Sequence, residues 1–128
     1  MLYSVLIYAS EAVAAARSRQ DDEALLARHL ALQRELAAEG RLGAVVRLMP
    51  TTTATTVRGT NQSMVIDGPF IETKEQLLGL YLVECATLEE AIETARRIGQ
   101  CCRTPDSGAL EIRPVSWSRL DVPRGEAP

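Results

Sequence analysis

The stretch MVIDGPFIETKEQLLGLYLV, residues 64–83, places a polar turn between two strongly apolar runs. Residues 64–66 lead into the turn Asp67-Gly68-Pro69, and residues 77–83 lead out of it. Apolar runs on both sides of a turn are typical of strands that border a core. Loops held by such strands often carry function. We therefore expect this block to lie at the edge of the core and to contain candidate site residues.

Spacing in the rest of the chain predicts two β-α-β units with a hairpin between them. Apolar residues occupy both alternating sets of residues 2–9, as in a strand covered on both faces. Thr87 followed by Glu90 forms a capping box that begins a helix. The expected strands are 2–9, 43–49, 77–85 and 109–115, and the expected helices are 21–40 and 88–98. A polar, alanine-rich connection precedes the first helix, and a hairpin pairs 51–58 with 63–66 across a turn at 59–62.

This order of elements predicts a ferredoxin-like α+β sandwich, with an antiparallel sheet and two helices on one face. Because the strands look apolar on both faces, the face without helices needs a cover, and a second copy of the chain is the simplest one. We expect a homodimer of the dimeric α/β barrel type. Residues 1–117 should form one domain, and residues 118–128 a flexible tail.

Composition excludes several classes of protein. The chain has 128 residues, 46% of them hydrophobic, which suits one compact domain. Its 14 basic and 17 acidic residues are dispersed and aromatics are few, so direct nucleic-acid binding is not expected. No apolar run is long enough to cross a membrane, and we expect a cytoplasmic protein. Three cysteines without a C-x-x-C spacing and one histidine predict no metal site, and we expect no cofactor.

His29 and Asp67 are the candidate catalytic residues. His29 is the only histidine, and imidazole titrates in the range that proton transfer near neutrality requires. Helical spacing places it in an apolar stripe with Leu25 and Leu32, so a packed histidine with one hydrogen bond is the alternative interpretation. Asp67 could orient the imidazole or act as a base. Alternatively it serves the turn, because an aspartate before glycine accepts backbone N–H bonds.

Three residues around the turn are candidate ligand contacts. Arg58, like Arg47, offers a guanidinium fork that matches a carboxylate or phenolate. Lys74 could hold an anion, although charged runs between strands are usually solvated. Phe70 could line a pocket, although filling the local core is the alternative. The sequence contains no glycine-rich phosphate loop, nucleophile elbow or H-E-x-x-H helix.

From residue 2 to residue 115 the chain resembles the YCII-related family, in its DGPF branch. The resemblance is carried by Leu6-Ile7-Tyr8, by residues 54–58 and 111–115, and most specifically by residues 67–82. It implies a ferredoxin-like fold that dimerises through its sheets, within a wider class that includes small-molecule lyases, isomerases and oxygenases.

The resemblance also bears on His29. In the YciI-type branch a similar helix histidine belongs to a His-Asp active site, and Arg28-His29-Leu30 is similar to that segment. The aspartate of that branch follows its second helix, where this sequence has Ile98-Gly99-Gln100, so Asp67 would have to replace it. DGPF-type proteins further resemble products encoded beside extracytoplasmic-function sigma factors, which implies a regulatory setting.

Together these observations predict a cofactor-free enzyme of lyase or isomerase type that binds a compact organic ligand, with His29 moving a proton. The alternative is a non-catalytic, ligand-sensing or regulatory dimer associated with a sigma factor. A purely structural assembly module is a third interpretation, because each candidate residue also has a plausible packing role.

Overall fold

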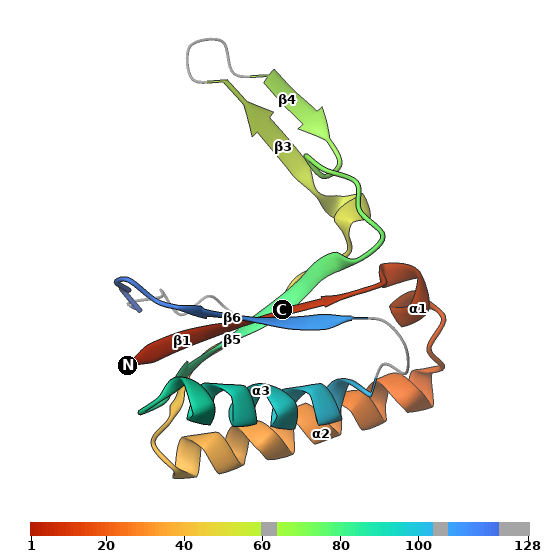
Figure 1. Cartoon of the computed structure of the whole chain (residues 1–128). Helices are drawn as coiled ribbons and strands as arrows, with labels where there is room; N and C mark the ends of the chain where they lie inside the picture. Colours follow the sequence, from red (N-terminus) through yellow and green to blue (C-terminus); the bar gives the residue numbers. More distant parts are fainter. Residues whose placement is uncertain (60–63, 104–107, 121–128) are drawn as a thin grey trace.

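The computed structural model describes residues 1–59, 64–103 and 108–120. Figure 1 shows a twisted sheet with two long helices on one face and a hairpin that projects on the other side. Among the described residues the strands are β1 (Leu2–Ala9), β2 (Leu42–Arg47), β3 (Thr55–Arg58), β4 (Met64–Asp67), β5 (Gln76–Glu84) and β6 (Ala109–Pro114). The helices are α1 (Glu11–Ala15), α2 (Arg19–Ala38) and α3 (Leu88–Cys102), with one 3-10 turn at Thr51–Thr53.

The order of the strands confirms the ferredoxin-like α+β fold. The main sheet has the order β2-β5-β1-β6, and every neighbouring pair is antiparallel. Helix α2 connects β1 to β2, and α3 connects β5 to β6, so each helix crosses over a strand that lies between the two it joins. Strands β3 and β4 form a separate two-stranded sheet, which is the projecting hairpin.

The core lies between the main sheet and the two long helices. Alternate residues of the central strands face the helices, because side chains of a strand point to opposite faces in turn. The buried core side chains are Tyr3, Val5, Leu32, Leu36, Tyr81, Val83, Cys85, Ala91, Ala95, Ile98 and Cys101. Leu25 and Leu32 of α2 are buried as the helical stripe predicted, and so is Leu36, one turn further along the helix. In the part of the chain that the structure describes, no helix is both long and apolar enough to span a bilayer.

The first half of the chain differs from the sequence prediction at the start of its long helix. Helix α2 begins at Arg19 rather than at residue 21, because the Ser18 side chain accepts a hydrogen bond of 3.0 Å from the Asp21 backbone and caps the helix. The polar, alanine-rich connection, to which no helix was assigned from the sequence, contains the short helix α1. Ser10 caps this helix by accepting from the backbone N–H of Val13. In both places the sequence signal for the helix start was a serine that accepts from the backbone N–H three residues later.

The second half differs at the end of α3 and in the hairpin. Helix α3 continues past residue 98 to Cys102 and ends where Arg103 takes a left-handed conformation with φ 44°. Thr87 caps its start, as predicted, through the Glu90 backbone N–H. The hairpin begins at Thr55, after the 3-10 turn, instead of at residue 51. Most of its expected turn (60–62, with 63 of the second strand) and most of the expected tail (121–128) lie outside the described residues.

Gly79 in β5 is a point where two backbones approach closely. It pairs with Arg47 of β2 and with Ile7 of β1, next to an irregularity in the β1 register. A Cβ atom at this position would lie 2.3 Å from the Val46 carbonyl oxygen, which is backbone and cannot turn aside. Only glycine therefore fits here.

We predict that Gly79→Ala lowers the free energy of unfolding by about 2–3 kcal/mol, because the strands must separate to admit the methyl group. Gly99→Ala is the matched control. Its Cβ would meet only the Leu110 Cδ1 atom, at 2.9 Å, and that side-chain end can move. In addition alanine favours a helix over glycine, so this variant should be neutral or more stable. Urea denaturation of both variants tests the difference, and equal stabilities would contradict it.

Candidate functional site

A cavity of about 1220 Å³ lies between the main sheet and the N-terminal half of α2. It is found where β1 and β2 end and where β5 and β6 begin, with α1 beside it. Apolar side chains form much of its wall, among them Ile7, Leu25, Val45 and Leu110. Ligand sites are commonly mostly apolar hollows that contain a few polar groups. The polar groups of this cavity therefore indicate what it could bind.

His29 of α2 lies on the wall of this cavity and is half-buried. Its Nδ1 atom is 2.6 Å from the Tyr81 hydroxyl oxygen. Its Nε2 atom is 3.7 Å from the Cys102 Sγ atom, near the end of α3. The imidazole is thus held by a strand on one side and by a helix on the other. Such fixed orientation is what a proton-transfer group requires.

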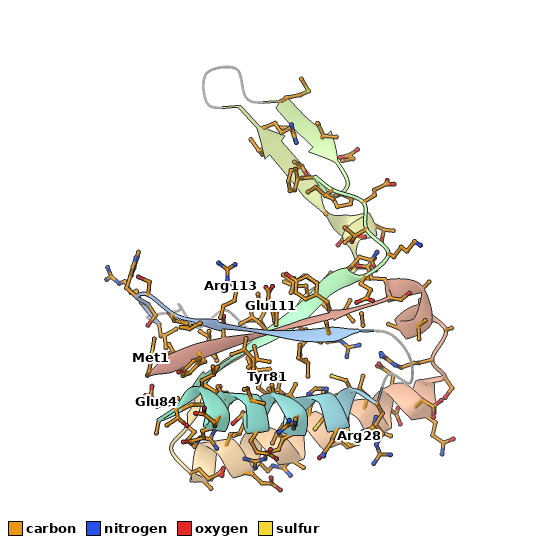
Figure 2. The ribbon with its side chains drawn as sticks, viewed as in Figure 1. Met1, Arg28, Tyr81, Glu84, Glu111 and Arg113 are labelled. Atoms are coloured by element: carbon orange, nitrogen blue, oxygen red, sulfur yellow. The ribbon has the colours of Figure 1, made fainter. Side chains whose placement is uncertain are left out.

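Tyr81 of β5 is the residue that anchors the imidazole. Its side chain points from the sheet toward the helices, as Figure 2 shows, and the residue is only 1% exposed. Gln33, one helical turn after His29, directs its Nε2 atom at the same hydroxyl, at 3.4 Å. His29, Gln33, Tyr81 and Cys102 all line the cavity. We call these four residues the histidine cluster.

The groups of the histidine cluster are held in their neutral forms. Burial lowers the pKa of His29 below its ordinary value of 6.5, and the positive charges of Arg28, Arg47 and Arg17 lower it further. Burial raises the pKa of Tyr81 to about 12, although the hydrogen bond from Gln33 opposes this. Burial likewise raises the pKa of Cys102. At neutral pH the cluster is therefore a chain of uncharged hydrogen-bonding groups.

Four charged side chains also line the cavity, and three of them are paired. Arg47, which the sequence had suggested as an anion contact, binds Asp22 with a distance of 3.2 Å. Glu11 accepts from the backbone N–H and the hydroxyl of Thr51, both at 2.7 Å. The fourth is Arg17, just before α2. Among the described residues no group of three or more histidine, cysteine, aspartate or glutamate side chains gathers as a metal site would.

The other site residues expected from the sequence lie on the hairpin and the segment after it. Asp67 ends β4 and is exposed, and the exposed Lys74 precedes β5. Arg58 of β3 stacks on Phe70, with its guanidinium carbon 5.3 Å from the ring centroid. The large cavity is lined by none of these four. A smaller hollow of about 300 Å³ at the hairpin base is instead lined by their neighbours Gly68, Pro69 and Thr73, among others.

Within one copy of the chain the structure does not bring His29 and Asp67 together. The hairpin that carries Asp67 projects on the side of the sheet opposite to α2, as Figure 1 shows. The position that a carboxylate would take beside the Nδ1 atom of His29 is occupied by Tyr81. A role for Asp67, Arg58, Phe70 or Lys74 in catalysis or ligand binding stays a prediction.

Sequence reasoning missed the partners of His29. Strand alternation alone places Tyr81 on the same face as Val83 and Cys85, but the partner of its hydroxyl depends on how α2 lies across the sheet. Gln33 did carry a signal, because residues four apart share a face of a helix. Cys102 was given no role, because the three cysteines of the chain lack the spacing of a metal or redox site.

We predict that His29 titrates below 6.5 in the native protein, because burial and three arginines favour the neutral imidazole. Asp67→Asn should leave this pKa unchanged, since Asp67 lies on the projecting hairpin. NMR titration of the one histidine ring measures both quantities. A pKa above 6.5, or a clear response to Asp67→Asn, would show that the carboxylate reaches the imidazole in solution.

Comparison with known proteins assigns the chain to a family. The family model of the YCII-related domain matches residues 1–118. An uncharacterised protein of Rhizobium meliloti (strain 1021) is 46% identical over 117 residues, which cover 91% of this chain and 93% of that protein. The match is to the YCII-related domain as such, so the DGPF branch stays a prediction. The chain belongs to the YCII-related family.

Proposed function

We propose that this protein is a small enzyme of lyase or isomerase type that binds a compact organic molecule in the large cavity and moves a proton with His29. The observation that carries the proposal is the position of His29, which lies on the cavity wall and is fixed by the Tyr81 hydroxyl at 2.6 Å. A neutral imidazole that is held in one orientation beside a bound ligand is suited to general acid or base catalysis. Imidazole exchanges protons itself, so the reaction needs no cofactor.

The rest of the cavity supports the same function. Its wall is mostly apolar, so a bound molecule would exclude water from around the imidazole. The lowered pKa of His29 keeps the ring neutral at the pH of a cell, which allows it to take part in proton transfer without first losing a charge.

We predict that the protein catalyses exchange of C–H protons next to a carbonyl group, and that His29→Gln slows this exchange by about 10²–10⁴-fold. The assay incubates the protein in D2O with a panel of small oxo acids, ketones and lactones. Loss of the proton NMR signals measures the exchange, so the natural substrate need not be known.

The control for this experiment is Leu30→Gln. Leu30 is the next residue of α2 and is 41% exposed on the outer side of the helix, so it receives the same replacement without touching the cavity. Its exchange rate should equal that of the native protein. Undiminished exchange in His29→Gln, or no exchange by the native protein with any compound of the panel, would contradict the proposal.

A second candidate function is a non-catalytic regulatory dimer, the setting in which a sigma factor would be the partner. It is favoured by the hairpin, whose apolar side chains are unusually exposed. Val57, Met64 and Val65 of the hairpin, and Phe70 just after it, are each more than 60% exposed. Exposed apolar side chains that gather on one element are typical of contact surfaces. The exchange experiment separates the two functions, because a purely regulatory protein would catalyse nothing.

We also propose that the chain forms a homodimer through the face of the main sheet that carries no helix. Leu6, Leu80 and Val46 lie side by side on this face, since Leu6 pairs with Leu80 and Leu80 pairs with Val46. They belong to the set of strand residues that alternates with the core residues, so the helices do not cover them. We call this surface the open face.

The charged side chains on the open face also support the proposal that a second copy of the chain packs against it. Glu111 and Arg113 of β6 point away from the helices, as Figure 2 shows, and they border the apolar row beside Leu6 and Ser4. In a two-fold interface each surface meets itself, so a patch with one negative and one positive group can pair with its own copy. Three free cysteines further support a reducing, cytoplasmic setting for this dimer.

We predict that sedimentation of the native protein gives twice the mass of the chain, and that Leu80→Arg gives a monomer because it places a charge in the centre of the interface. The control is Leu88→Arg at the start of α3, a position that is 50% exposed on the helical side. That variant should remain a dimer. A monomeric native protein, or a dimer in Leu80→Arg, would contradict the proposed interface.

A further inference from the structure

The hydrogen bonds of Tyr81 determine which nitrogen of His29 carries its proton. A buried tyrosine hydroxyl can donate one hydrogen bond and accept others, and leaving its proton without an acceptor is costly. Two polar atoms lie near the Tyr81 oxygen, namely His29 Nδ1 at 2.6 Å and Gln33 Nε2 at 3.4 Å. The amide nitrogen of Gln33 can only donate. His29 Nδ1 must therefore be the acceptor of the tyrosine proton.

The other tautomer, with the proton on Nδ1, satisfies fewer of the hydrogen-bonding groups around Tyr81. If His29 Nδ1 carried the proton and donated it, the Tyr81 proton would need the Gln33 side chain to turn its carbonyl oxygen toward it. The resulting O–H···O contact would be 3.4 Å long, beyond the usual range of about 2.5–3.0 Å. The distance of 2.6 Å to His29 suits a strong bond from a phenol to a neutral imidazole nitrogen.

The proton of a neutral His29 then resides on Nε2, the ring nitrogen nearest Cys102, which also lines the cavity. The Sγ atom of Cys102 is a weak acceptor at 3.7 Å. A ligand oxygen would be a better one. In this tautomer His29 presents an N–H donor, so it is the acid of the proposed proton transfer: the Nε2 proton is shared with a ligand oxygen as negative charge develops there, and water takes the C–H proton. The matching ligand group is an oxygen with a free electron pair, such as a carbonyl.

The charges around the cavity add a second requirement. Glu11 already accepts hydrogen bonds from Thr51, and Asp22 already forms an ion pair with Arg47. The Arg17 side chain has no hydrogen bond or ion pair with the residues that the structure describes, although it is close enough to influence His29 and Cys102. The two positive and two negative charges of the lining cancel, but Arg17 is the one of the four whose side chain is not already engaged by another described residue. An organic carboxylate bound in the cavity would engage this guanidinium.

We propose that the natural ligand is a compact oxo acid, whose carboxylate binds Arg17 and whose oxo oxygen accepts the Nε2–H bond of His29, with Tyr81 as the positioning residue that fixes this tautomer. The inference rests on the proposed function for the site that it describes. It goes beyond that function by assigning the chemistry of the ligand. Binding and tautomer can both be measured without any turnover.

The first experiment reads the tautomer from the ¹⁵N chemical shifts of the one histidine, at a pH where the ring is neutral. The native protein should carry the proton on Nε2. Tyr81→Phe should give a mixture of tautomers, because the donor to Nδ1 is gone. Tyr3→Phe is the matched control, since Tyr3 is another buried core tyrosine and His29 does not contact it. A proton on Nδ1 in the native protein would overturn the proposal.

The second experiment measures binding of three related probes by NMR titration up to about 10 mM, a range that covers weak millimolar affinities. The probes are phenylpyruvate, phenylacetone, which lacks the carboxylate, and 3-phenylpropanoate, which lacks the oxo oxygen. Phenylpyruvate should bind best. Arg17→Gln should weaken phenylpyruvate about tenfold and leave phenylacetone unchanged. Tyr81→Phe should reduce the preference for phenylpyruvate over 3-phenylpropanoate about threefold.

The two experiments also separate this inference from the proposed function. Equal binding of phenylpyruvate and phenylacetone, no effect of Arg17→Gln, or no binding of phenylpyruvate in the tested range would overturn the ligand class. Any of these results leaves the proton-exchange activity of His29 to be judged by its own assay. Conversely, binding of phenylpyruvate as described without any exchange would retain the ligand site and remove the enzyme.

Discussion

The hydroxyl of Tyr81 imposes the constraint on which this structure most depends. The ring lies in the core, where its apolar atoms pack well, but the oxygen at its end needs hydrogen-bond partners there because the residue is only 1% exposed. Those partners come from α2, at two positions one turn apart. The helix must therefore lie across the sheet in one register. The same register opens the cavity and places an imidazole on its wall.

A second constraint lies within the sheet, where the backbones of β2 and β5 approach each other closely. Gly79 lets β2 and β5 draw together two residues before Tyr81, in a place where a Cβ atom would strike a carbonyl. Val45, directly opposite Tyr81, then packs under the same helix. A rigid strand and a helix in fixed register together hold the polar atoms of the cavity in place. Loops carry little of the histidine cluster, unlike many binding sites.

The family-like sequence and the candidate proton-transfer groups lie in two separate regions of the molecule, the hairpin and the cavity. The stretch of sequence that most resembles the family lies in and beside the hairpin, whereas the groups suited to proton transfer lie between the sheet and the helices. Two opposite faces of one sheet thus serve different purposes in our proposals, one for the ligand and one for the second copy. The ferredoxin-like fold permits this division because its helices cover a single face.

Sequence by itself determined the class of fold and the family, and it singled out His29 as a candidate residue. Alternating apolar residues mark strands, capping residues mark helix starts, and both signals are local, so a single chain reveals them. Only the tertiary structure decided that Tyr81, Gln33 and Cys102 surround His29, and that Asp67 lies elsewhere in the same chain. Contacts between residues about 50 or 70 positions apart depend on the angle and register at which helices pack on a sheet, and no local pattern encodes these quantities.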